Sequence, residues 1–127
     1  MKIDFEVRDY ECDTQGIVNN ANYLHYLEHA RHKYLLEKNI NFIELAKKDQ
    51  NLVIKEAKYN YHQALKPDDK FYVLTEAKLL NKVKIQFKQS IYRQDELILT
   101  AELIAVCVSY ENKKIHKINE VVSYDFQ

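Results

Sequence analysis

The feature that most limits the possible folds is a single long segment with helical spacing, which stands among segments that alternate like strands. From residue 20 to about residue 38, apolar side chains recur every three or four positions and form one stripe. This stripe comprises Leu24, Leu27, Tyr34 and Leu35, widened by Tyr23, Tyr26 and Ala30. Because one amphipathic helix cannot bury its apolar face alone, it must pack against the sheet that the other segments form.

A break and a second, shorter helix are expected directly after this segment. Asn39 can end the long helix in a left-handed backbone conformation, which asparagine tolerates better than most residues. Asn41 is a preferred N-cap type for the next helix. Glu44 stands three residues later, where its side chain can complete a capping box.

Five further segments alternate as half-buried strands do, with every second side chain apolar. They cover residues 3–10, 53–61, 71–79, 83–91 and 97–110, and a short last strand is expected near residues 115–118. Short turns such as "LKPDDK", with the only proline, Pro67, connect the later segments. The stretch "LIAVCV" is apolar on both faces, which is typical of a strand inside a sheet. We predict an α+β fold, a curved antiparallel sheet of about five strands wrapped around one long helix.

Length and composition exclude several classes of protein. With 127 residues, the chain is predicted to form one domain over residues 1–127. A net charge of zero argues against a nucleic-acid partner, because binding to phosphates needs surplus positive charge. The N-terminus "MKIDFEVRDY" lacks the apolar run of a signal peptide, and no window is long enough for a membrane span. Cys12 and Cys107 fit a reducing compartment, so we expect a soluble cytoplasmic protein.

The stretch "ECDTQGIVNNANYLHYLEHAR", residues 11–31, contains the only glycine of the chain, Gly16. Asp13 stands just past the first predicted strand, and Gly16 permits a positive φ or a close backbone approach. Asn19 or Asn20 is a preferred N-cap type, so the long helix is expected to begin there. A helix start carries unpaired N–H groups and the positive end of the helix dipole. The stretch therefore brings a carboxylate and a set of N–H donors together.

This combination suits cleavage of a reactive carbonyl compound. N–H groups at a helix start stabilise negative charge on a carbonyl oxygen, while a carboxylate attacks the carbon or activates water. Aspartate is ionised at neutral pH and is a weak base, which suits a thioester with its good leaving group better than an amide. An aspartate near a glycine is also ordinary turn chemistry, so the pattern alone leaves a purely structural role open.

The same stretch resembles the signature of the hotdog-fold acyl-CoA thioesterases of the 4-hydroxybenzoyl-CoA thioesterase type. The matching residues are Asp13, Gly16, Ile17, Val18, Asn19, Asn20, Tyr23, Glu28, Ala30 and Arg31. The resemblance covers essentially the whole chain, because "YNYHQALKPDDKFYV" is similar to the next landmark of the family, a strand and a turn leading into a second strand. The predicted order of elements is also that of the hotdog fold.

The resemblance implies an enzyme that hydrolyses an acyl-CoA to a free acid and CoA, with no cofactor and no metal. Asp13 matches the catalytic carboxylate of the family, as nucleophile or general base, and the backbone N–H of Asn20 matches the group that polarises the carbonyl. The implied substrate-binding residues are Gly16, Ile17, Val18, Asn19 and Tyr23. Subunits of this family usually form homodimers or homotetramers, with the active site at the subunit interface. Many relatives have histidine at position 20, where this chain offers an amide side chain.

Other interpretations stay open at this point. A hotdog module that binds acyl-CoA or acyl carrier protein without hydrolysis has the same fold. The segment "HYLEH", with His25 and His29, spells the inverted zinc-peptidase motif, although no second long helix is predicted to supply a third ligand. Glu28 is expected to pair with Arg31 one turn later, or to act as a second active-site carboxylate.

Two further features have both a structural and a functional interpretation. Cys12 lies beside Asp13, but no base or positive group is placed to activate its thiol, so we interpret it as a small apolar filler. A basic row on the outer face of one strand comprises Lys82, Lys84, Lys88 and Arg93. Such a row either keeps a sheet face solvated or contacts the phosphates of CoA.

Overall fold

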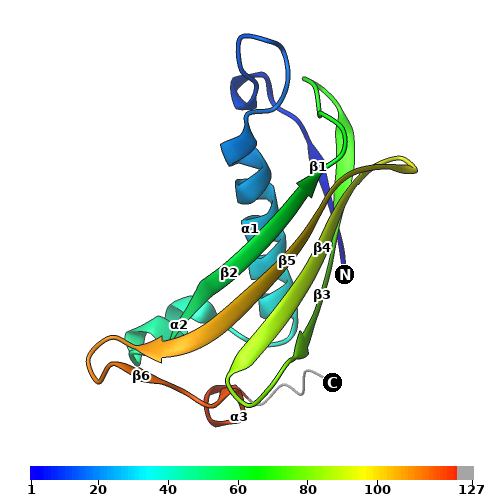
Figure 1. Cartoon of the computed structure of the whole chain (residues 1–127). Helices are drawn as coiled ribbons and strands as arrows, with labels where there is room; N and C mark the ends of the chain where they lie inside the picture. The colour runs from blue at the N-terminus through cyan, green and yellow to red at the C-terminus, as the bar shows by residue number, and fades with distance from the viewer. Residues whose placement is uncertain (123–127) are drawn as a thin grey trace.

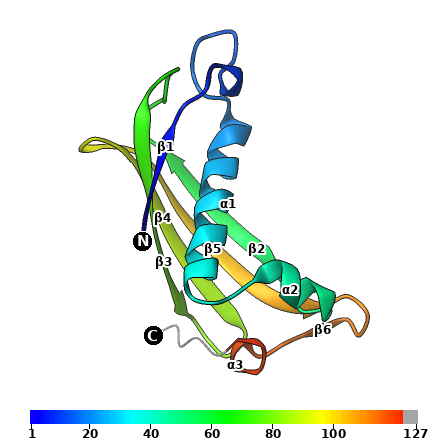
Figure 2. The same cartoon turned by 180° about the vertical axis from the view of Figure 1, so that it is seen from behind.

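The computed structural model describes residues 1–122, which form a curved sheet with helices on its concave side (Figure 1). In chain order the elements are β1 (Lys2–Glu6), the 3-10 helix η1 (Asp9–Glu11), α1 (Asn20–Glu37), α2 (Phe42–Lys47), β2 (Asn51–Tyr61), β3 (Lys70–Leu79), β4 (Lys84–Arg93), β5 (Glu96–Ser109), β6 (Lys114–Ile115) and α3 (Ile118–Val121). From behind, α1 runs along the sheet, with α2 beside its far end (Figure 2). No helix within residues 1–122 is long and apolar enough to cross a membrane.

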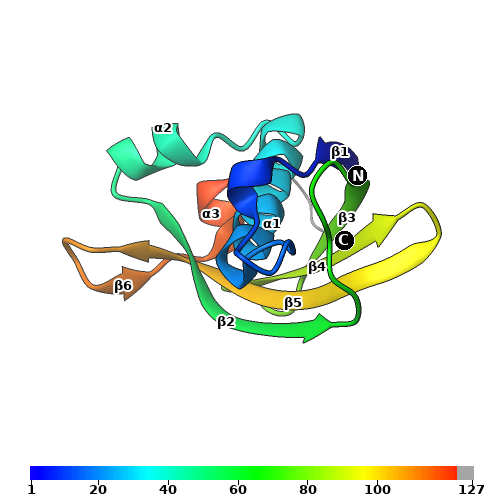
Figure 3. The same cartoon turned by 90° about the horizontal axis from the view of Figure 1, so that it is seen from above.

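Every strand pairing in the sheet is antiparallel. The strand order is β1-β3-β4-β5-β2, and the short β6 pairs with β5. β5 lies between β4 and β2, as the doubly apolar stretch in its sequence predicts. The view from above shows the sheet curling around α1 (Figure 3). The predicted α+β architecture, a curved antiparallel sheet around one long helix, is therefore confirmed.

The core lies between α1 and the concave face of the sheet. The buried residues of α1 are Tyr23, Tyr26, Leu27, Ala30, Arg31, Tyr34 and Leu35. From β4, the alternating positions Ile85, Phe87 and Ile91 face this helix and are also buried. Leu24 was predicted on the buried stripe, but it is 39% exposed because the aromatic rings of Tyr23 and Tyr26 occupy the inner face instead.

The first predicted strand is shorter than its alternation suggests. β1 ends at Glu6, and the chain turns into η1 before residue 10. The turn is stabilised by the N–H of Arg8, which donates to the Glu11 carboxylate at 2.8 Å. At the other end of the chain, the predicted strand near residues 115–118 is limited to β6, and Ile118 instead begins α3.

The residues predicted to end α1 and to cap α2 do so, with one exception. Asn39 has a φ of 61°, so it ends α1 in the left-handed conformation, as predicted. The side chain of Asn41 caps α2 by accepting the N–H groups of Ile43 and Glu44. The predicted capping box is not completed, because the Glu44 carboxylate pairs with Lys47 at 3.0 Å.

β2 has one paired edge and one open edge. It is 11 residues long, and within residues 1–122 it pairs with β5 alone. A register shift between Ile54 and Glu56 marks a bulge, which bends the strand around the helix. An open strand edge presents unpaired N–H and carbonyl groups, so β2 can accept a further strand.

Candidate active site

The loop between η1 and α1 is a tight hairpin that holds Asp13 in front of the helix. Cys12 and Val18 form an antiparallel bridge. Inside this bridge, the Asp13 N–H donates to the Ile17 carbonyl at 2.9 Å, and the Gly16 N–H donates to the Asp13 carbonyl at 3.1 Å. Gly16 has a φ of +76°, and a Cβ atom there would meet nothing within 4 Å. Glycine is therefore favoured by the backbone conformation and not by crowding.

The Asp13 carboxylate lies on the exposed side of this hairpin. Its Oδ1 accepts the N–H of Gln15 at 2.8 Å, which fixes the side chain over the turn. Within residues 1–122, no other hydrogen bond and no ion pair engages this carboxylate. One carboxylate oxygen is therefore held by the turn while the other is available to a ligand.

At the start of α1, the N–H of Asn20 stands without an acceptor among the described residues. Asn19 is the N-cap, and its side chain accepts the Ala21 N–H at 2.9 Å. The carbonyl of Asn19 accepts the Asn22 N–H at 2.9 Å, and its own N–H donates to the Glu11 carbonyl at 3.0 Å. Among residues 1–122, nothing accepts the N–H of Asn20, the first residue of the helix. This donor lies at the positive end of the helix dipole and is free for a ligand.

Three hydrogen bonds hold the loop and the elements on either side of it in place. The Val18 N–H donates to the Leu65 carbonyl at 2.8 Å. The Leu65 N–H in turn donates to the Tyr23 hydroxyl at 2.9 Å. From the helix side, the Asn22 amide donates to the Glu11 carbonyl at 2.8 Å. The position of Asp13 relative to the helix start is thus fixed from both sides.

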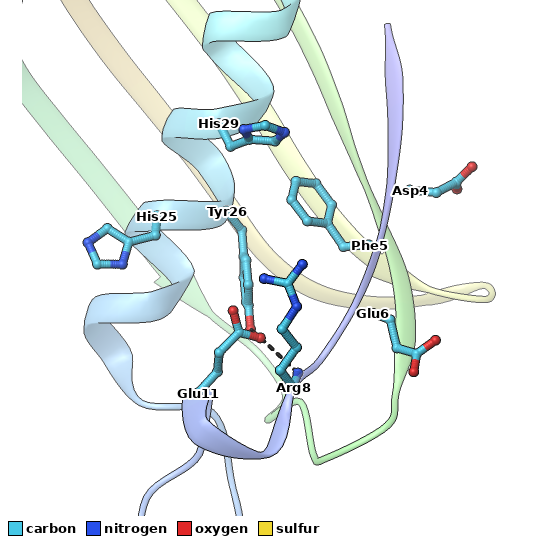
Figure 4. A pocket seen from close by; sticks show the side chains of 8 residues that line it. All are labelled: Asp4, Phe5, Glu6, Arg8, Glu11, His25, Tyr26 and His29. Atoms are coloured by element: carbon cyan, nitrogen blue, oxygen red, sulfur yellow. Dashed lines mark hydrogen bonds between the residues drawn. The ribbon is translucent and has the colours of Figure 1, made fainter.

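A pocket of about 500 Å³ opens beside this loop, between β1 and the N-terminal half of α1 (Figure 4). It is lined by Asp4, Phe5, Glu6, Arg8, Glu11, His25, Tyr26 and His29. The Tyr26 hydroxyl donates to the Glu11 carboxylate at 2.8 Å. Burial and this hydrogen bond raise the pKa of the Tyr26 hydroxyl, so the group stays a donor. Asp13 and Asn20 do not line this pocket.

A second pocket of about 350 Å³ lies between α1, α2 and the sheet. It is lined by Glu28, Arg31, His32, Leu35, Phe42, Leu52, Val53, Ile54, Ile85, Phe87 and Ala105. The Arg31 side chain donates from Nη1 to the Gln89 side-chain oxygen at 3.0 Å. The predicted ion pair between Glu28 and Arg31 is wrong, because no carboxylate within residues 1–122 lies within 4.0 Å of the Arg31 guanidinium.

The sequence matches the thioesterase-like superfamily over residues 7–126. The chain belongs to this superfamily. The chain is 33% identical over 115 residues to the acyl-CoA thioesterase YbgC of Haemophilus influenzae. The match covers 87% of this chain and 83% of that protein. The chain is 36% identical over 107 residues, 83% of its length, to the chloroplastic acyl-acyl carrier protein thioesterase ATL3 of Arabidopsis thaliana. The match spans 56% of the length of that plant protein.

The fold of the thioesterase-like chain has a close counterpart among solved structures. It is similar to a hypothetical protein of Aquifex aeolicus with a TM-score of 0.88 at 28% identity, covering 97% of both chains. The family resemblance that rests on the stretch from Asp13 to Arg31 is therefore confirmed, and with it the hotdog fold.

The structure brings most of the predicted site residues of the thioesterase-like chain onto one loop. These are Asp13, Gly16, Ile17, Val18 and Asn19, and Asn20 follows them as the first residue of α1. Val18 and Tyr23 are buried, and the Tyr23 hydroxyl is occupied by the Leu65 N–H. Tyr23 thus anchors the neighbouring segment in the core, and its contact with substrate stays a prediction. The catalytic roles of Asp13 and Asn20 also stay predictions.

The zinc-peptidase interpretation gains no third ligand. His25 and His29 line the pocket beside the loop, as neighbours one helical turn apart. The ring of His29 packs edge-on against Phe5, with 5.8 Å between the centroids. Within residues 1–122, no group of three or more histidine, cysteine or acidic side chains is placed to hold a metal ion.

The surroundings of Cys12 and of Arg93 bear on the functional interpretations of the thiol and of the basic row. Burial and the carboxylates of Glu11 and Asp13 raise the pKa of the Cys12 thiol, which makes it a poor nucleophile. Arg93 does not belong to a free basic row, because its guanidinium pairs with Asp69 at 2.6 Å and with Glu96.

Gln89, which accepts a hydrogen bond from Arg31 of the second pocket, was not predicted from the sequence as a functional residue. The signal was present, since Gln89 continues the inward-facing positions Ile85 and Phe87 of β4 as a polar residue on an apolar face. A polar side chain at such a position needs a buried partner. Gln89 has three such partners, which are Leu27, Arg31 and Thr75.

Proposed function

We propose that this chain is an acyl-CoA thioesterase, which hydrolyses the thioester to a free acid and CoA. The observation that carries the proposal is that the N–H of Asn20 has no acceptor among residues 1–122. Asn20 is the first residue of α1, and the hairpin that holds Asp13 directly precedes it. An unpaired donor at a helix start favours negative charge on a carbonyl oxygen. A relative that is 33% identical, YbgC, bears the name acyl-CoA thioesterase.

In the proposed reaction, the carbonyl oxygen of the thioester accepts the N–H of Asn20, which draws electron density from the carbonyl carbon. The Asp13 carboxylate either attacks that carbon or takes a proton from a water molecule that attacks it. The first route forms an anhydride that water then hydrolyses. In both routes the carbon–sulfur bond breaks, its electron pair leaves on the CoA sulfur, and that sulfur takes up a proton. Water supplies the new oxygen of the acid.

The rest of the loop contacts the substrate in this proposal. Gly16 has open space where a Cβ atom would stand, which leaves room for the thioester beside Asp13. Ile17 and Val18 supply apolar surface, and Asn19 holds the helix start in place through its cap. Tyr23 lies behind this surface and supports it from the core.

A second copy of the chain completes the site in this proposal. Asp13 and Asn20 are exposed and line neither pocket described above, so a lone subunit gives the thioester no enclosing wall. The open edge of β2 can pair with the β2 strand of a second copy to form one continuous sheet. The expected assembly is a homodimer, or a homotetramer built from two such pairs. Sedimentation that gives a monomer at assay concentration contradicts this part of the proposal.

We place the protein in the cytoplasm, where thiols stay reduced. Cys12 and Cys107 are both free cysteines in the structure. Cys107 is fully buried in the core, and burial raises the pKa of its thiol to about 11. Fractionation of cells with an antibody against the protein tests this location, and recovery in a secreted or membrane fraction contradicts it.

The same hydrolysis on acyl carrier protein is a second candidate function. The observation in its favour is the match to ATL3, which bears the name acyl-acyl carrier protein thioesterase, at 36% identity. The carrier alters the recognition surface outside the loop, while the chemistry at Asp13 and Asn20 is the same. A panel that offers each acyl group on both carriers separates the two functions.

The test is release of free thiol from acyl-CoA and acyl carrier protein substrates of varied chain length. Asp13→Asn is expected to lower the turnover by a hundredfold or more, in the range typical for loss of a catalytic acid or base. Asp95→Asn, in the exposed turn between β4 and β5, is the matched control and is expected to keep the wild-type rate. Wild-type turnover by Asp13→Asn contradicts the role of Asp13. Tight binding of acyl-CoA with no hydrolysis by the wild type identifies a non-catalytic binding module instead.

A further inference from the structure

The second pocket combines an apolar lining with a buried positive charge. Its apolar wall is formed by Leu35, Phe42, Leu52, Ile85, Phe87 and Ala105, which come from both helices and from the sheet. Arg31 contributes to the same wall from α1 and is only 9% exposed. A guanidinium keeps its positive charge even when buried, so this pocket has a cation at the side of an apolar space.

No carboxylate of the described residues forms a close ion pair with Arg31, and Glu28 acts on its charge only from beyond 4.0 Å. Within residues 1–122, its guanidinium makes one hydrogen bond, from Nη1 to the Gln89 oxygen, and no ion pair. A guanidinium has five N–H donors, so most of them have no protein acceptor. Among residues 1–122, no side-chain nitrogen or oxygen is both fully buried and unpartnered, so the guanidinium nitrogens of Arg31 that make no hydrogen bond are not fully buried, and Arg31 lines the pocket.

Gln89 holds this guanidinium in position and offers no compensating charge. Its amide nitrogen donates to the Leu27 carbonyl at 3.0 Å and to the Thr75 hydroxyl at 2.9 Å. These two bonds fix the side chain so that its oxygen faces Arg31. The network is neutral apart from Arg31, and it is built from three elements, α1, β3 and β4. The guanidinium is thus a preorganised donor group.

Two other titratable groups face the pocket, and neither pairs with Arg31. Glu28 lines the pocket from an exposed position one helical turn before Arg31, beyond 4.0 Å from its guanidinium. His32 stacks on Phe42 with 4.0 Å between the ring centroids. Burial lowers the pKa of the His32 imidazole, which favours its neutral form. Arg31 therefore remains the buried cation of the pocket.

We propose that this pocket binds a carboxylic acid with an apolar body, whose carboxylate pairs with the Arg31 guanidinium while its body fills the apolar space. A carboxylate matches the planar donor fork of arginine in a bidentate geometry. The apolar lining selects against small hydrophilic anions, because they leave that surface uncovered. The acid released by the proposed hydrolysis belongs to this class, which makes that product a ligand of the required chemistry. That last consequence rests on the proposed function, whereas the binding site itself does not.

The test is direct binding of octanoate and octanol, measured by calorimetry on the wild-type protein without any thioester. The two ligands share an apolar body, and only octanoate carries a charge. Octanoate is expected to bind at least tenfold more tightly than octanol. Equal affinities, or no binding of octanoate, overturn the proposal. Because no hydrolysis is measured, this outcome is independent of whether the chain cleaves thioesters.

Three variants sharpen the assignment to Arg31. Arg31→Met keeps an apolar side chain of similar length and is expected to remove the preference for octanoate while octanol still binds. Lys33→Gln, an exposed position on the same helix that does not line the pocket, is the matched control and is expected to keep the preference. Ala105→Leu fills the pocket and is expected to abolish binding of both ligands. An undiminished preference for octanoate in Arg31→Met, or undiminished binding in Ala105→Leu, overturns the proposed site.

Discussion

The N–H of Asp13 donates to the carbonyl of Ile17 at 2.9 Å, and this bond ties the proposed catalytic carboxylate to the segment that leads into α1. The bridge between Cys12 and Val18 closes the same hairpin one step further out. The loop therefore has a fixed shape, although its side chains are mostly exposed. Donors and acceptors that are already fixed favour binding and catalysis, because less free energy is then lost in ordering them when a substrate binds.

Gly16 is expected to be needed for this shape because its φ is +76°. Gly16→Ala is predicted to lower the free energy of unfolding by about 1 kcal/mol, the usual cost of a side chain in the left-handed region. Gly16→Asn is the control, because asparagine tolerates a positive φ, and its loss should be clearly smaller. Urea unfolding of the three proteins measures the difference. Equal stability of wild type and Gly16→Ala would show that the hairpin does not need this conformation.

Gln89 is expected to stabilise the core through its bonds to Arg31, Leu27 and Thr75. Gln89→Leu leaves the buried guanidinium without its only hydrogen-bond partner among the described residues, so a loss of about 3 kcal/mol in the free energy of unfolding is predicted. The control Gln86→Leu, on the outer face of the same strand, should change stability by less than about 0.5 kcal/mol.

A double variant separates the charge of Arg31 from the packing of Gln89. Combining Gln89→Leu with Arg31→Met removes the unpaired charge together with its partner. The predicted destabilisation of the pair is smaller than the sum of the two single changes, because the two residues form one network. Strict additivity in urea unfolding would mean that the two side chains are not coupled.

Asp49 links the end of α2 to the end of β5. The hydroxyl of Ser109 and the N–H groups of Tyr110 and Glu111 all donate to its carboxylate. The Ser109 hydrogen bond is the main cause that lowers the pKa of the Asp49 carboxyl below its ordinary value of 3.8. A lowered pKa in the folded state gives stability that is fully present above the ordinary value and is lost as the pH falls through the lowered value.

Asp49→Asn is therefore predicted to lower the melting temperature at pH 7, and the deficit should shrink as the pH falls below about 3.8. Asparagine tolerates the φ of 57° at this position, so the change removes the charge with little backbone strain. Asp95→Asn controls for the loss of one negative charge at an exposed turn. A deficit that stays constant from pH 7 to acid pH would rule out ionisation of Asp49 as its cause.

The sequence alone predicted the architecture because the patterns behind it are local. Helical spacing over α1 and alternation over β3, β4 and β5 each follow from which side chains face the core. The end of β1 was misplaced because alternation continues past Glu6, while the N–H of Arg8 donates to the Glu11 carboxylate and closes η1. Such a hydrogen bond cannot be predicted from the alternation of apolar and polar residues. Leu24 was misplaced for a related reason, since helical spacing leaves open which neighbour is more deeply buried.

The candidate site was only partly visible in the sequence. The loop from Asp13 to Asn20 is continuous in the chain, so its residue types and spacing pointed to it directly. The pocket around Arg31 is assembled from α1, α2, β2, β4 and β5, and no local pattern records that assembly. The pairing of Arg31 with Gln89 joins positions 58 residues apart, whereas the sequence favoured the neighbouring Glu28.

Two substitutions of Asn20 distinguish a role of its side chain from a role of its backbone N–H. Asn19 is the N-cap and has a ψ of 140°, a conformation that a following proline accepts. Asn20 occupies the first helical position, where proline is well tolerated because its missing N–H would have no intrahelical acceptor. Asn20→Pro thus removes the proposed donor while α1 is preserved. Asn20→Ala removes only the side chain and keeps the N–H.

The most direct measurement of the central claim is kcat for thioester hydrolysis by these two variants, with circular dichroism as the check that both are folded. Asn20→Ala is predicted to stay close to the wild type. Asn20→Pro is predicted to lose a hundredfold or more, as expected when one donor to the developing oxyanion is removed. Turnover by folded Asn20→Pro at the rate of Asn20→Ala would contradict the claim that the helix start polarises the thioester carbonyl.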